Sequence, residues 1–192
     1  MKKISIAGIA GGIILFIWSF LAWDKLPLHS PSMHSIPNED AVADVLKLNI
    51  ATKGVYLIPA HPGMGADQAT MNAWAEKVNR GPNAMIMYDP LGADPMMTSQ
   101  MVIGIILDIL SAMMIAWFLT RSTAVTAPYM ARVFYCGMLA VFVSIFTHIM
   151  NWNRMGTPSD FTAGLIVDNI IGCLLAGLVI AAIIKPSTTI TA

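Results

Sequence analysis

The sequence predicts an α-helical integral membrane protein with four transmembrane helices and a small extracytoplasmic α/β cap between the first two. Of its 192 residues, 56% are hydrophobic and 11% are charged, and the mean hydropathy is +0.67. Soluble domains carry about 25% charged residues. Four apolar stretches reach the length of about 20 residues that a helix needs to cross a bilayer. They are residues 4–23, 98–120, 133–152 and 161–184.

The first stretch, residues 4–23, follows a basic start at Lys2 and Lys3, as the core of a secretory signal does. It is longer than a typical signal core, and Phe20 and Ala22 do not form a small-x-small cleavage site. We therefore expect a retained signal-anchor helix.

Residues 24–97 are predicted to form the cap. Asn38 and Asp67 are typical N-cap residues and indicate the starts of two helices. Residues 54–59 and 84–88 have the composition of strands. Two strands are too few to be stable alone, so the cap needs the membrane helices, a second copy or a partner. The second helix has an apolar face, which we expect to be buried: Met71, Trp74, Ala75 and Val78.

The second and fourth predicted membrane helices share a weak internal repeat. Residues 104–116 align without gaps to residues 164–176, and each segment has Gly, Asp and two small residues at four-residue intervals. The pattern indicates a tandem two-helix repeat with its axis along the membrane normal, the cap being an insertion in the first half. The alternative is that two apolar helices align by chance.

Asp108 and Asp168 lie inside these apolar stretches, where an ionisable side chain is costly and indicates a site. Counted at about 1.5 Å per residue from the basic residue at the predicted inner end of each helix, both carboxyls and His148 lie roughly 20–25 Å deep, at one level. These basic residues are Arg121, Lys185 and Arg132. Asn169 lies beside them. Such a group can bind a proton or a cation. The alternative is structural, because small flanking residues bring helices close enough for a protonated carboxyl to hydrogen-bond across.

Thiol and metal chemistry have weaker support. Cys136 and Cys173 lie inside predicted helices, and we interpret them as packing residues. Met and His together suit copper, but their spacing here matches no metal motif, so we expect no cofactor. The candidate ligands in the predicted external loops are His29, Met33, His34 and His61.

The charges around the apolar stretches predict the orientation. One side of the membrane receives five basic residues and no Asp or Glu, so the positive-inside rule places both termini in the cytoplasm and residues 24–97 outside. The Met-Lys-Lys start suggests a bacterial inner membrane. The five basic residues are Lys2, Lys3, Arg121, Arg132 and Lys185.

The net charge of zero argues against nucleic-acid binding, and no catalytic motif is present. We favour a non-enzymatic accessory or structural subunit of a larger inner-membrane protein complex. In this hypothesis the cap is the docking surface, and the partners are the lipid bilayer and either other membrane protein subunits or further copies of the chain. The first alternative is a proton- or cation-coupled transport component that uses the intramembrane Asp and His residues. The second is a metal-binding membrane protein or enzyme.

Overall fold

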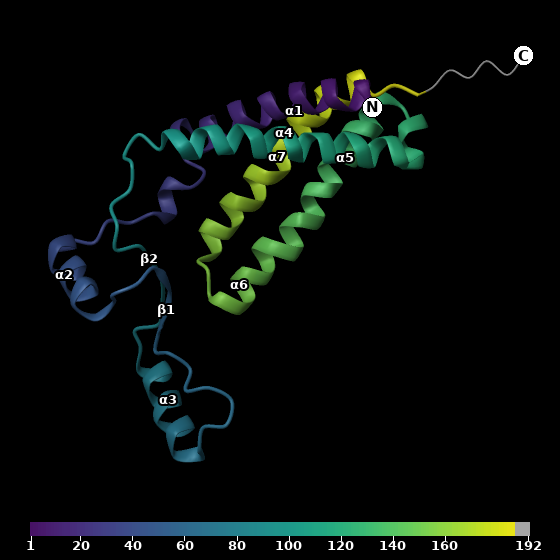
Figure 1. The fold of residues 1–192 in the computed structure, drawn as a ribbon. Coiled ribbons are helices and arrows are strands. Elements are labelled where there is room, and N and C mark those ends of the chain that lie inside the picture. Colours follow the sequence, from purple (N-terminus) through teal and green to yellow (C-terminus); the bar gives the residue numbers. More distant parts are fainter. Residues whose placement is uncertain (187–192) are drawn as a thin grey trace, which may run out of the picture. The chain divides into compact units, whose positions relative to one another are not determined.

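The computed structural model describes residues 1–186, and the chain divides into two units (Figure 1). Met1–His34 and the chain from Met96 onward form the first, which we call the membrane unit. Ser35–Pro95 form the second, which we call the inserted unit.

The membrane unit contains the four predicted helices, each long and apolar enough to cross a membrane, as in a multi-pass membrane protein. Two of them contain a π-helical turn, and the third run ends in the short helix α6. The elements are α1 (Lys2–Phe20) with its π-helical extension η1 (Leu21–Lys25), α4 (Thr98–Arg121), α5 (Tyr129–Ser144) with η4 (Ile145–Ile149, π-helical) and α6 (Met150–Met155), and α7 (Ser159–Ile183).

Helix α1 packs along both α4 and α7, and α5 packs along α7 (Figure 1). The pairs α1/α4 and α5/α7 are the two hairpins that a tandem repeat requires. The repeat itself stays a prediction, because the pairing of consecutive helices is also what short connections produce.

Two glycines allow α1 to approach α4 closely. A Cβ atom at Gly12 would overlap the backbone of Ile109, and one at Gly8 would overlap Met113. Helices in a membrane gain stability from van der Waals contact rather than from the hydrophobic effect, and small residues four apart maximise that contact.

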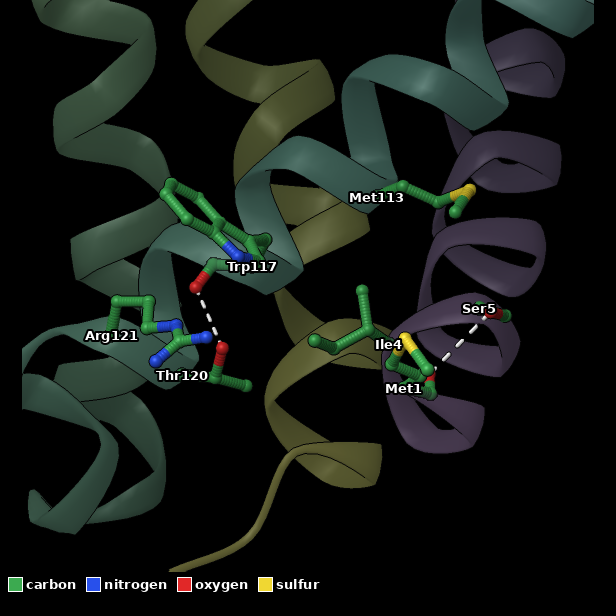
Figure 2. Close-up of a pocket in the computed structure, with 7 residues that line it drawn as sticks. All are labelled: Met1, Ile4, Ser5, Met113, Trp117, Thr120 and Arg121. Carbon is green, nitrogen blue, oxygen red and sulfur yellow. Dashed lines mark hydrogen bonds between the residues drawn. The ribbon is translucent and has the colours of Figure 1, made fainter.

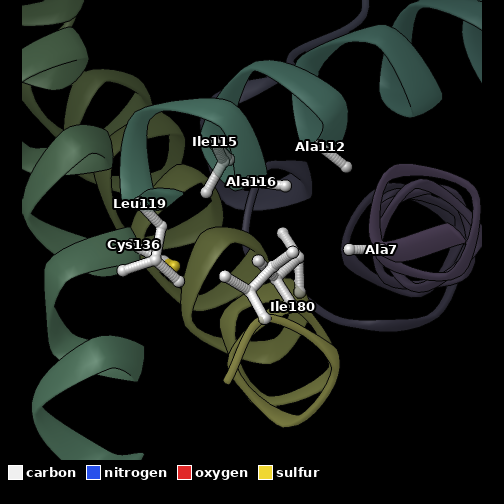
Figure 3. Close-up of a cluster of buried hydrophobic side chains, with 9 residues drawn as sticks. Ala7, Ala112, Ile115, Ala116, Leu119, Cys136 and Ile180 are labelled. Carbon is white, nitrogen blue, oxygen red and sulfur yellow. The ribbon is translucent and has the colours of Figure 1, made fainter. Parts of the chain in front are cut away.

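The apolar core lies where α1, α4, α5 and α7 meet, in the helix halves nearest to Lys2, Arg121 and Lys185, which we call the basic end (Figure 3). Arg132 is buried beside it and donates hydrogen bonds to the carbonyl oxygens of Ala127 (2.9 Å) and Ala181 (3.1 Å). The core residues are Ala7, Ala112, Ile115, Ala116, Leu119, Cys136, Ala176, Ile180 and Ile184.

The inserted unit has the predicted order helix, strand, helix, strand. Its two strands pair antiparallel, with Gly54 opposite Tyr88 and Ile58 opposite Ala84. The Asp67 side chain accepts a hydrogen bond from the backbone N–H of Thr70 (2.7 Å), and this bond lowers the pKa of its carboxyl. The elements are α2 (Glu39–Asn49), β1 (Gly54–Ile58), α3 (Gln68–Arg80) and β2 (Ala84–Tyr88).

No residue of Ser35–Pro95 is buried. The apolar face of α3 that we expected to be buried (Met71, Trp74, Ala75 and Val78) is only half-buried. Two short strands and two helices have too little surface to enclose it. Large apolar side chains remain open to solvent, among them Leu48 (85% exposed) and Met87 (79%).

Candidate functional site

Asp168 of α7 binds two side chains from the first 34 residues. The indole Nε1 of Trp18, on α1, donates to the carboxyl Oδ1 (2.7 Å) and also lies 3.0 Å from the backbone oxygen of Asp168. The Nε2 atom of His29 lies 3.1 Å from Oδ2. Both carboxyl oxygens therefore have partners, so Asp168 ties the segment that follows α1 to α7.

His29 is buried, with 1% of its surface exposed. The sequence predicted a loop here and gave no sign of this burial. Its ring stacks on Trp23 with a centroid distance of 3.9 Å, and the ring of Phe161 contacts its edge. A Cβ atom at position 164 would lie 2.5 Å from the carbonyl oxygen of Leu28, so glycine at Gly164 lets this segment lie against α7.

The second ring nitrogen of His29, Nδ1, has no hydrogen-bond partner among residues 1–186. An ionised carboxylate only accepts hydrogen bonds, so beside ionised Asp168 the proton of a neutral His29 lies on Nε2. A doubly protonated ring would leave a buried N–H unsatisfied at Nδ1, which costs more than an unpaired acceptor. Nδ1 is therefore a buried ring nitrogen whose hydrogen bonding the described residues leave unsatisfied.

The four intramembrane residues singled out by the sequence all line one cavity of about 270 Å³. They come from three helical runs: α4 supplies Asp108, η4 supplies His148, and α7 supplies Asp168 and Asn169. Trp18, Trp23, Ser19, Leu15, Leu165 and Gly172 complete the lining.

These four residues have different bonding. Asn169 donates to the carbonyl oxygen of Ala140 (3.1 Å) and to the hydroxyl of Ser144 (3.0 Å), so it holds α7 against α5. Asp168 is bound as described above. Asp108 and His148 are half-buried and make no hydrogen bond or ion pair within the described part of the chain. They are titratable side chains without such bonds, the kind of group that can exchange a proton with water or bind a small cation.

Both π-helical turns of the membrane unit contribute side chains to this cavity. Leu21–Lys25 carries Trp23, and Ile145–Ile149 carries His148. A π-helical turn adds one residue within a helix and is frequent at functional sites. The sequence contains no Pro or Gly in either turn that would have predicted it.

The small residues that flank the two carboxyls do not pack equally. Gly172 lies against Trp18, where an added Cβ would be 2.9 Å from the ring, and Gly164 lies against Leu28. Gly104, the counterpart of Gly164 in the predicted repeat, has nothing within 4 Å of an added Cβ. The expected close approach of a helix is therefore wrong at Gly104.

The four candidate metal ligands do not come together. His29 binds Asp168, Met33 and His34 are exposed in the membrane unit, and His61 belongs to the inserted unit, where its Nδ1 accepts from the backbone N–H of Gly63 (3.0 Å). In residues 1–186, no group of three or more His, Cys, Asp or Glu side chains is arranged to hold a metal ion.

We expect Trp18→Phe to reduce stability by about 1–3 kcal/mol, because it keeps the ring but leaves a half-buried carboxyl oxygen of Asp168 without its donor. Trp152→Phe is a matched control, since that indole N–H donates to the hydroxyl of Ser159 at an exposed position, and it should change stability by less than about 0.5 kcal/mol. Unfolding of the purified chain in detergent measures both. Equal losses in the two variants would show that Asp168 does not hold α1.

In comparisons with protein families, curated proteins and solved structures, nothing matched this chain.

Proposed function

We propose that the chain is a non-enzymatic accessory subunit of a larger membrane protein complex, and that the inserted unit docks onto another subunit. The observation that carries this proposal is the absence of any buried residue in Ser35–Pro95, although both its strands and its helices have apolar faces. Folded units are stable by only a few kcal/mol, and burial of apolar surface is their main source of stability. A partner that covers these faces would supply the missing burial.

A cavity of about 520 Å³ on the inserted unit indicates the docking surface. It is lined by the end of β1 and one face of α3, including Leu57, Ile58 and Trp74. The indole N–H of Trp74 has no acceptor within the described residues. Trp side chains are common anchors of protein interfaces, and Trp74 contributes to the surface of this cavity that a partner would contact.

The charge of the inserted unit favours a different subunit over a second copy of the chain. Ser35–Pro95 contains seven acidic and four basic residues, a net charge of −3. Two such units would repel each other, whereas a neutral or basic partner surface would not.

Leu57→Glu should abolish docking, because Leu57 is half-exposed and lines the cavity. Val55→Glu is the matched control: Val55 is exposed on the same strand, two residues away, and does not line the cavity. We expect a partner to co-purify in equal amounts with the wild type and with Val55→Glu, and to be lost with Leu57→Glu. Retention with Leu57→Glu, or recovery of the wild type only as self-associated chain, would contradict docking to another subunit.

We also propose that the protein resides in a bacterial inner membrane with both termini in the cytoplasm and the inserted unit outside. The support is the absence of acidic residues at the basic end, which carries Lys2, Lys3, Arg121 and Lys185. A cysteine introduced at exposed Asp67 should react with an impermeant thiol reagent in cells whose outer membrane is permeable. Reaction only after lysis of the inner membrane would reverse the orientation.

A second candidate function is proton or cation handling at the intramembrane cavity. Asp108 and His148 favour it, because both line the cavity and neither makes a hydrogen bond or an ion pair within residues 1–186. A carboxyl kept in an apolar span without a partner is expensive, and such groups commonly mark proton or ion pathways. Asp168, whose oxygens are both bound, would then serve as a fixed wall of the site.

Asp108→Asn tests this second function, since it keeps the size of the side chain and removes its ionisation. In the wild type, acidification protonates all eleven Asp and Glu side chains and produces infrared carbonyl bands from each of them. Asp108→Asn should remove the part of this signal that belongs to Asp108. Asp168→Asn is the comparison and should leave that part in place. If Asp108→Asn leaves both this signal and the assembly of the complex unchanged, Asp108 has no ionisable role.

A further inference from the structure

The basic end of the membrane unit contains a second cavity, of about 480 Å³, between the first turns of α1 and the last turns of α4 (Figure 2). It shares no residue with the cavity that Asp108, His148, Asp168 and Asn169 line. The lining residues are Met1, Ile4, Ser5, Met113, Trp117, Thr120 and Arg121.

This cavity has an apolar part and a cationic part. Met113, Trp117 and Arg121 follow one another at four-residue intervals, so they share one face of α4. At about 1.5 Å per residue, Arg121 lies roughly 12 Å further along the helix than Met113. Ile4 of α1 lines the same cavity as Met113 and Trp117 of α4 (Figure 2). The lining thus changes from apolar to cationic towards the end of the helix, as a membrane lipid changes from acyl chain to headgroup.

The guanidinium group of Arg121 is the hydrogen-bond donor that this cavity presents to a ligand. Its side chain is exposed, its guanidinium lies 5.9 Å from the ring centroid of Trp117, and it makes no hydrogen bond or ion pair within the described residues. The neighbouring hydroxyls are already used, because Thr120 donates to the carbonyl oxygen of Trp117 (2.7 Å) and Ser5 to that of Met1 (3.5 Å). An arginine fork matches the oxygens of a phosphate, and its stacking on Trp117 restricts it without consuming its donors.

The charge around the cavity is of one sign. Lys2 and Lys3 begin α1 at this end, and no Asp or Glu occurs between Asp108 and Asp160 or from Asn169 to Lys185. The first turn of α1 also adds the positive end of a helix dipole. Arg132, the other arginine of this end, is occupied by the carbonyl oxygens of Ala127 and Ala181. The phosphate of a ligand would therefore meet Arg121 and the two lysines with no competing carboxylate.

We propose that this cavity binds one anionic phospholipid, with its phosphate on Arg121 and the start of an acyl chain along Ile4, Met113 and Trp117. Basic pockets between membrane helices are known to hold acidic lipid headgroups. The apolar lining is what distinguishes a lipid from free phosphate as the occupant, since inorganic phosphate would leave the apolar part of the cavity unfilled.

Native mass spectrometry of the full chain in detergent, titrated with phosphatidylglycerol or phosphatidylcholine, tests this proposal. We expect the first phosphatidylglycerol to bind more tightly than phosphatidylcholine, and Arg121→Gln to weaken it about fivefold. Arg121→Lys should retain part of the affinity, because it keeps the charge and loses the fork. Arg154→Gln is the control, since Arg154 is an exposed arginine of α6, at the other end of its helical run, and it should bind as the wild type does.

Three results would overturn the lipid site. They are equal binding of the two lipids, equal weakening by Arg121→Gln and Arg154→Gln, and displacement of phosphatidylglycerol by inorganic phosphate at the same concentration. The last result would show that the site recognises phosphate alone.

Discussion

A carboxyl group in an apolar helix must find hydrogen-bond donors inside the protein, because the bilayer offers none. Asp168 meets this requirement with two partners that lie far from it in sequence, the indole N–H of Trp18 and the imidazole of His29. These two contacts also determine where the segment after α1 lies. The chain after α1 turns back so that Leu28 and His29 lie on α7, and Gly164 is the residue that makes room for them. One buried carboxyl thus fixes the end of α1, the following loop and one wall of the intramembrane cavity.

The two units of the chain differ in how completely they bury their apolar side chains. In the membrane unit, Gly8 and Gly12 bring backbones together, and the core residues at the basic end are almost completely enclosed. The inserted unit has regular strands and well-capped helices but encloses nothing. Local signals are therefore sufficient to form its elements, while its packing is incomplete within the unit itself. That contrast is the physical basis for proposing that the inserted unit completes its core against another protein.

Sequence patterns predicted the parts of this structure that depend on local periodicity. Helix length and hydropathy predicted the four membrane helices, and N-cap residues predicted α2 and α3. Asp108, His148 and Asp168, which the sequence singled out together, line one cavity, and their common depth stays a prediction. The burial of His29 was missed, because a histidine in a Pro- and Ser-rich segment has no periodic pattern to follow. The π-helical turns were missed because neither contains a helix-breaking residue that a sequence pattern could detect. They occur instead where the helices pack around the cavity.

Asp108 and Asp168 show how far an identical local pattern can diverge in its chemistry. Each carboxyl follows a glycine by four residues and precedes small residues at the same interval, yet Gly164 packs against Leu28 while Gly104 has open space beside it. The difference arises because the segment after α1 covers only one of the two positions. Asp168 has both partners, and Asp108 keeps its carboxyl for the cavity. When two titratable groups share a cavity but not an environment, their roles separate. On the proposed proton-handling function, Asp168 is the residue that builds the site, and Asp108 with His148 is the pair that can change its charge.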